Sequence, residues 1–117
     1  MTLALLIPPF QAILAQPAMS TVYTNGPASN RLNIVILSEG YTTNELGNFL
    51  VDATNAANVL LGWEPYQEYR NYFNVFAIKV ASAESGSDHP VGAVYRDTYF
   101  NSSYDSFSDL LITIPPE

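Results

Sequence analysis

Four side chains in the sequence have the chemistry of a metal or acid–base site: Glu39, Glu84, Asp88 and His89. Carboxylates bind hard divalent cations, and zinc prefers histidine combined with carboxylates. Their spacing matches no structural or catalytic metal site, and acids in such positions commonly cap turns or helices. We therefore expect no catalytic residue and no metal-ligand set here, and keep the four as candidates for a ligand-binding loop.

Several other chemistries are excluded by residue type. The chain has no cysteine, which excludes disulfides, zinc–thiolate sites and thiol nucleophiles. No G-x-S-x-G motif is present, and Ser38-Glu39-Gly40 lacks the glycines and lysine of a phosphate loop. The chain has four basic and eleven acidic residues, which gives a net charge of −7. Binding to nucleic acid or to an anionic membrane surface is therefore not expected.

Two apolar runs must position the four candidates. The run Leu32–Leu37 is typical of a buried strand, and Asn74–Ala81 is a second one. Between them, Thr42 and Glu45 fit a capping box, and apolar residues recur at helical spacing from 46 to 60. Strand, helix and strand in this order predict a βαβ unit with a right-handed crossover. The expected fold class is α/β, with a small, mostly parallel or mixed sheet.

This topology places the candidates at one edge of the sheet. Parallel strands end at the same edge, where ligands of α/β proteins gather. Glu39 follows the first strand, and the polar loop from Ser82 to Pro90 follows the second. A separate aromatic stripe, Tyr66, Tyr69 and Phe73, is predicted to pack as core on a short helix beginning at Pro65, with an aromatic ligand platform as the alternative.

The first 20 residues are apolar and uncharged. Pro8-Pro9 and Gln11 interrupt the run, so no membrane span is expected. A signal peptide ending near Ala18-Met19-Ser20 fits the residues, as does an apolar arm that packs on the domain. We therefore expect a leader over 1–20, a linker over 21–29 and one domain over 30–117. A signal peptide implies a secreted, periplasmic or cell-surface protein.

An ordered series of short motifs runs through residues 30–117. It comprises Ser38-Glu39-Gly40-Tyr41-Thr42, Glu64-Pro65-Tyr66, Tyr69, Phe73-Asn74-Val75, Ser82, Glu84-Ser85-Gly86 and Asp97-Thr98-Tyr99-Phe100. This order resembles the opening of the M64 family of zinc metallopeptidases, the IgA-peptidase family. The resemblance implies the N-terminal part of a zincin-like domain, and a protein or peptide substrate for the complete enzyme.

The family's zinc site is not among these motifs. In the family, zinc is held by an H-E-x-x-H helix whose glutamate activates water. This chain has a single histidine, His89, so it contains no such motif. The resemblance thus implies zinc for the complete enzyme, no cofactor and no catalytic residue in this chain, and no activity of the chain alone. The alternative is a non-catalytic α/β binding or accessory module with an acidic, loop-lined ligand site.

Overall fold

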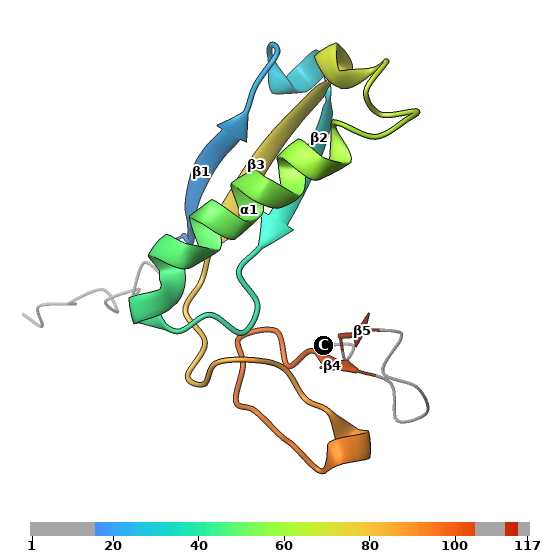
Figure 1. The fold of residues 1–117 in the computed structure, drawn as a ribbon. Coiled ribbons are helices and arrows are strands. Elements are labelled where there is room, and N and C mark those ends of the chain that lie inside the picture. The colour runs from blue at the N-terminus through green and yellow to red at the C-terminus, as the bar shows by residue number, and fades with distance from the viewer. Residues whose placement is uncertain (1–15, 105–111, 115–117) are drawn as a thin grey trace, which may run out of the picture.

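The computed structural model describes residues 16–104 and 112–114. The described elements are β1 (Ala18–Tyr23), β2 (Leu32–Leu37), α1 (Leu46–Leu60), β3 (Phe73–Lys79), β4 (Ser103–Tyr104) and β5 (Ile112–Thr113), with short 3-10 turns at Ala28–Asn30, Thr43–Glu45, Arg70–Tyr72 and Pro90–Gly92. Figure 1 shows α1 lying across one face of a sheet, with the loops that follow β3 beyond the end of that sheet.

The main sheet has the strand order β1-β3-β2. β2 pairs in parallel with β3, from Leu32 opposite Phe73 to Leu37 opposite Ile78. β1 pairs with the other edge of β3 in the antiparallel direction. The predicted α/β class with a mixed sheet is therefore confirmed, and the βαβ unit consists of β2, α1 and β3.

β1 is an element that the sequence patterns did not predict. It runs across the boundary between the expected leader and the expected linker, and pairs Ala18, Met19 and Ser20 with β3. A break in register between Thr21 and Tyr23 marks a bulge. Residues 21–23, which were expected to begin the linker, are therefore part of the sheet.

α1 forms where the capping box and the helical periodicity predict it. The Glu45 carboxylate accepts hydrogen bonds from the Thr42 amide (2.9 Å) and hydroxyl (2.7 Å), at the turn that leads into the helix. Phe49, Ala53 and Ala57 form its buried stripe. They pack against Val75 and Ala77 of β3, both fully buried, so α1 and the sheet share one apolar core.

The opposite face of the sheet carries apolar side chains that remain accessible. Ile34 and Ile36 pack into the core beneath α1, so Val35 and Leu37 point the other way. Their exposed fractions are 48% and 41%, and that of Met19 on β1 is 64%. Within the described residues, then, this sheet has one face covered by a helix and one apolar face without such a cover (Figure 1).

The segment between α1 and β3 differs from the prediction. Residues 62–69 form turns, and the only regular element there is the 3-10 turn Arg70–Tyr72. Tyr66 and Tyr69 are 41% and 54% exposed, whereas Phe73 is half-buried. The prediction that this stripe forms core is therefore wrong for the two tyrosines.

α1, the longest helix of the described part, has 15 residues, and no helix there combines the length and apolar character needed to cross a membrane.

Candidate functional site

The carboxyl ends of β2 and β3 are held together by Ser38. Its side chain is fully buried, and its hydroxyl donates to the Val80 carbonyl (2.6 Å) and accepts from the Val80 amide (2.7 Å). Val80 therefore has both backbone groups satisfied by one side chain just after its strand ends. This clamp fixes where the loop after β3 begins.

Gly40 lets that loop come close. Its φ is +71°, and a Cβ at this position would lie 2.1 Å from the Gly86 carbonyl oxygen. The Gly86 amide donates to the Gly40 carbonyl (2.9 Å). The Ser82 hydroxyl accepts from the amides of Gly40 and Tyr99, each at 3.1 Å. Only glycine fits this contact without displacing the loop.

Glu39 binds the next loop in turn. Its carboxylate accepts hydrogen bonds from the Thr98 hydroxyl (2.5 Å) and from the amides of Phe100 (3.0 Å) and Ser102 (2.9 Å). Burial raises the pKa of Glu39, but these three donors stabilise the charged form and together lower the pKa below its ordinary value. Glu39 is therefore an ionised anchor for residues 98–102.

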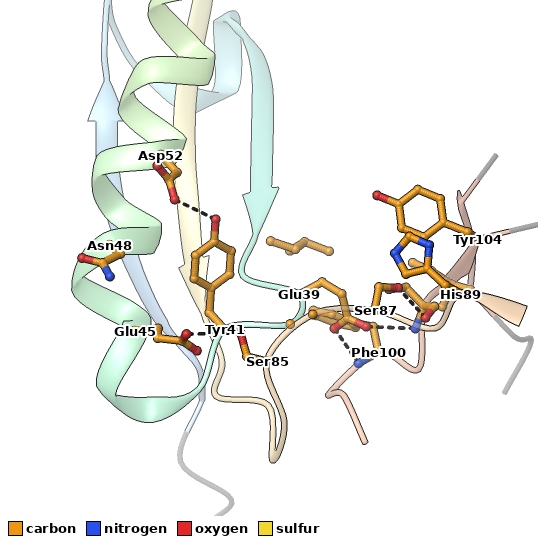
Figure 2. A pocket seen from close by; sticks show the side chains of 15 residues that line it. Glu39, Tyr41, Glu45, Asn48, Asp52, Ser85, Ser87, His89, Phe100 and Tyr104 are labelled. Atoms are coloured by element: carbon orange, nitrogen blue, oxygen red, sulfur yellow. Dashed lines mark hydrogen bonds between the residues drawn. The ribbon is translucent and has the colours of Figure 1, made fainter. Parts of the chain in front are cut away.

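These contacts leave a groove of about 610 Å³ at the strand ends, which we name the strand-end groove. Figure 2 shows Glu45, Asn48 and Asp52 on the α1 side and His89 with Tyr104 on the other, with Glu39 between them. The full lining is Leu37, Glu39, Gly40, Tyr41, Glu45, Asn48, Asp52, Ser85, Gly86, Ser87, His89, Phe100, Ser102, Tyr104 and Ile114.

The two sides of the groove are ordered by specific contacts. The Tyr41 hydroxyl donates to Asp52 (2.9 Å), and this bond, with burial, raises the pKa of Tyr41. On the opposite side, the rings of His89 and Tyr104 stack with centroids 4.3 Å apart. Back on the α1 side, hydrogen bonds from Thr42 and Ser85 lower the pKa of Glu45, which is therefore ionised at neutral pH.

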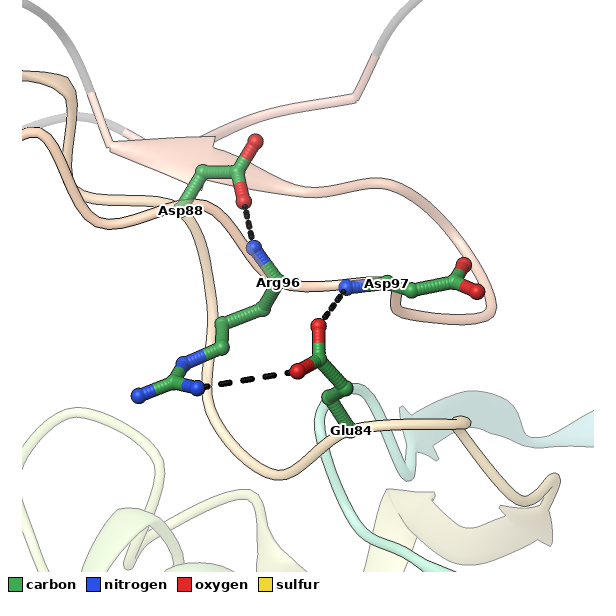
Figure 3. A network of polar contacts seen from close by, with 4 residues as sticks. All are labelled: Glu84, Asp88, Arg96 and Asp97. Carbon is green, nitrogen blue, oxygen red and sulfur yellow. Dashed lines mark hydrogen bonds and ion pairs between the residues drawn. The ribbon is translucent and has the colours of Figure 1, made fainter.

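The structure brings two of the four candidates to the groove. Glu39 and His89 line it, whereas Glu84 and Asp88 serve the neighbouring loop (Figure 3). Glu84 accepts from the Asp97 amide (2.7 Å) and lies 3.7 Å from the Arg96 guanidinium. Asp88 accepts from the Arg96 amide (2.5 Å). The acids of this loop thus act as backbone clamps.

The described residues do not fit the zinc site of a metallopeptidase. Among them, no three histidine, aspartate or glutamate side chains are grouped closely enough to hold a metal ion. The ring of His89 stacks against Tyr104. Glu84 and Asp88 instead accept hydrogen bonds from the backbone amides of Asp97 and Arg96. No step of zinc chemistry can be assigned to this part of the chain.

Sequence reasoning missed several groove residues: Tyr41, Glu45, Asn48, Asp52 and Tyr104. A signal existed for two of them. Asn48 and Asp52 are four residues apart on the polar side of the predicted helix, so they lie one above the other. No local pattern indicates that this side of α1 borders the strand ends.

A second cavity, the aromatic cleft, lies where β2 and β3 begin. It measures about 680 Å³ and is lined by Arg31, Leu32, Pro65, Tyr66, Tyr69, Tyr72 and Phe73, with Ser29 and Asn30. The parallel strands run from this cleft toward the strand-end groove. The two cavities are therefore at opposite ends of the sheet, and a ligand can be located at one or the other.

Comparison with known proteins gives a family. No curated protein matches the chain significantly. The family model described as IgA Peptidase M64 matches residues 21–113, which is well over half of the chain. The match includes β1 from Thr21 onward, the βαβ unit and the loops that form the strand-end groove. The chain therefore belongs to the M64 family of IgA peptidases.

Proposed function

We propose that this chain is the N-terminal scaffold segment of a secreted zinc metalloendopeptidase, and that its strand-end groove is one wall of the substrate cleft. One observation carries the proposal. The residues that build the groove, Ile114 excepted, fall within the family match, yet their contacts are loop anchors and not a metal site. Family membership supports a protein or peptide as the substrate.

The catalytic group would come from elsewhere in the complete enzyme. Zinc bound by an H-E-x-x-H helix supplies an activated water for peptide hydrolysis. A single histidine in the whole sequence cannot form that motif. This chain would then position substrate and support the catalytic helix, and it would be inactive alone.

The uncovered face of the sheet supports the role of a scaffold. Strands that are apolar on both faces normally have both faces covered. Val35 and Leu37 are exposed opposite α1, and β2 is also an edge strand. Such a surface favours association when it is left open. A further part of the same enzyme would cover it.

Secretion rests on the apolar leader, and β1 bears on where a leader could be removed. Cleavage after Ser20 would delete Ala18, Met19 and Ser20, which pair with Lys79, Ile78 and Ala77. We therefore propose that processing leaves Ala18 in the mature chain. N-terminal sequencing of secreted protein would test this: a first residue after Ala18 would contradict it.

Three measurements on the full 117-residue chain test the proposed function. With added zinc and an internally quenched peptide, we expect no hydrolysis above the blank and no stoichiometric zinc binding by calorimetry. With a fluorescein-labelled mixture of random hexapeptides, we expect a saturable rise in anisotropy. Zinc-dependent hydrolysis would overturn the scaffold role, and a flat anisotropy curve would overturn the substrate wall.

The accessory-module alternative makes a different prediction for assembly. A free-standing module should be monomeric and unfold cooperatively, whereas a scaffold with an open apolar sheet face should self-associate. Sedimentation velocity at several concentrations separates the two. A concentration-independent monomer would favour the accessory module, in which the acidic strand-end groove would be the ligand site.

A further inference from the structure

The strand-end groove carries an uncompensated negative charge. Glu39, Glu45 and Asp52 line it, and no lysine or arginine does so among the described residues. The hydrogen-bond donors to these carboxylates are neutral: hydroxyl and amide groups of Thr98, Phe100 and Ser102 for Glu39, of Thr42 and Ser85 for Glu45, and of Tyr41 for Asp52. Neutral donors orient a carboxylate without cancelling its charge.

The placement of these carboxylates suits a positively charged group at the end of a long side chain. They come from the end of β2, the start of α1 and the second turn of α1, and Figure 2 shows them spread along the groove. They do not form a group that could hold a metal ion in the described part of the chain. A charged group at the end of a flexible stem can reach such separated carboxylates.

The rest of the lining suits that stem. Tyr41, Phe100 and Tyr104 present aromatic surface to the groove. The His89–Tyr104 stack forms a flat wall opposite α1. Aliphatic stems pack on such surfaces, and a guanidinium or ammonium group is attracted to aromatic faces.

We propose that the strand-end groove binds an arginine or lysine side chain of the peptide substrate, with Asp52 and Glu45 as its counter-charges. The inference rests on the proposed function, which makes this groove a wall of the peptide cleft. It adds specificity: peptides with a basic residue would bind in preference to neutral peptides of the same shape.

Two capped pentapeptides test the inference on the full chain: Ala-Ala-Arg-Ala-Ala and the same peptide with citrulline, which has nearly the shape of arginine without its charge. We expect the arginine peptide to bind about fivefold tighter at 20 mM salt, as for exposed ion pairs. The difference should shrink at 500 mM salt, because screening weakens such pairs.

Two variants locate the effect. Asp52→Asn should weaken binding of the arginine peptide about threefold and leave the citrulline peptide unchanged. Glu68→Gln removes the same charge from the turns before β3, away from the groove, and should change neither affinity. Asp52 is exposed on α1, so the variant should fold, which its amide spectrum would verify.

The outcomes separate the inference from the function on which it rests. Equal affinities for the two peptides would overturn the preference for a cation while leaving the peptide wall intact. A similar loss in Asp52→Asn and Glu68→Gln would overturn the placement of the cation in the groove. Failure of both peptides to bind would overturn the inference and the peptide wall together.

Discussion

Replacing Ser38 by alanine tests the clamp on which the groove is built. The Ser38 hydroxyl is the hydrogen-bond partner of both backbone groups of Val80, at 2.6 and 2.7 Å. Ser38 is 0% exposed and Val80 is 6% exposed, so water cannot easily replace the hydroxyl. The substitution therefore leaves one buried donor and one buried acceptor without a partner.

The expected cost follows from these two groups. An unsatisfied buried polar group costs about 1–3 kcal/mol, so two cost about 2–6 kcal/mol. We expect Ser38→Ala to lower the free energy of unfolding by about 3 kcal/mol, a large share of the 5–15 kcal/mol typical of a domain. The Val80 amide should also exchange its hydrogen much faster, because its acceptor is gone.

Urea unfolding followed by circular dichroism measures this loss. The matched control is Ser85→Ala, which removes an exposed hydroxyl that donates to Glu45 (3.2 Å) and should cost less than about 0.5 kcal/mol. A loss below about 0.5 kcal/mol in Ser38→Ala, with the slope of the urea dependence unchanged, would refute the clamp. Val80 would then have other partners.

Three further predictions concern the groove and the sheet. The lowered pKa of Glu39 stabilises the fold above the ordinary value of 4.5, and this stabilisation is lost as the pH falls through the folded-state pKa. Glu39→Gln should therefore reduce the fall in melting temperature as the pH is lowered into the acid range. An unchanged fall would mean that the Glu39 carboxylate does not stabilise the fold. Gly40→Ala should lower the free energy of unfolding by about 2 kcal/mol or more, because the new Cβ would clash with Gly86 and φ is positive. Gly47 lies on α1 with open space around it, so Gly47→Ala should raise the free energy of unfolding by about 0.5–1 kcal/mol. Equal effects of the two substitutions would contradict the close approach of Gly40 to Gly86. A chain beginning at Thr21 should be about 2–3 kcal/mol less stable than one beginning at Gln16, since three residue pairs of β1 are lost, and equal stability would show that these pairs are dispensable.

The elements predicted correctly are those with local signals. α1 is predicted by two neighbouring signals. These are the capping box at Thr42 and Glu45 and the apolar stripe through Phe49 and Ala53. β2 and β3 are near-continuous apolar runs, interrupted only by Asn33, Asn74 and Lys79, and such runs are typical of strands covered by a helix. Their parallel pairing then follows from the length of the connection between them.

β1 could not be predicted in the same way. Ala18, Met19 and Ser20 resemble the end of a leader, and the three β-forming residues that follow them, Thr21–Tyr23, are too short a run to predict a strand. Their partners on β3 are about sixty residues away, so the strand exists only because the far edge of β3 is available. Tertiary pairing of this kind overrides local propensity.

The candidate site also combines features that local sequence predicts with features that depend on tertiary contacts. The position of Glu39 at the end of β2 was predictable, but its donors lie 59 to 63 residues further along the chain. Glu84 and Asp88 were expected beside it, yet the backbone near Arg96 offers them closer partners. Residue type indicated the acidity of this edge, and only the fold determines which acids face the groove.

Mapping a bound peptide onto the chain tests the central claim most directly. Amide shifts of the ¹⁵N-labelled chain would be followed during titration with the capped pentapeptide Ala-Ala-Arg-Ala-Ala. We predict saturable shifts at strand-end groove residues such as Gly40, Tyr41 and Ser87, with little change at Tyr69 and Tyr72 in the aromatic cleft. Shifts confined to the aromatic cleft, or none at either end of the sheet, would contradict the claim that the strand-end groove is a wall of the substrate cleft.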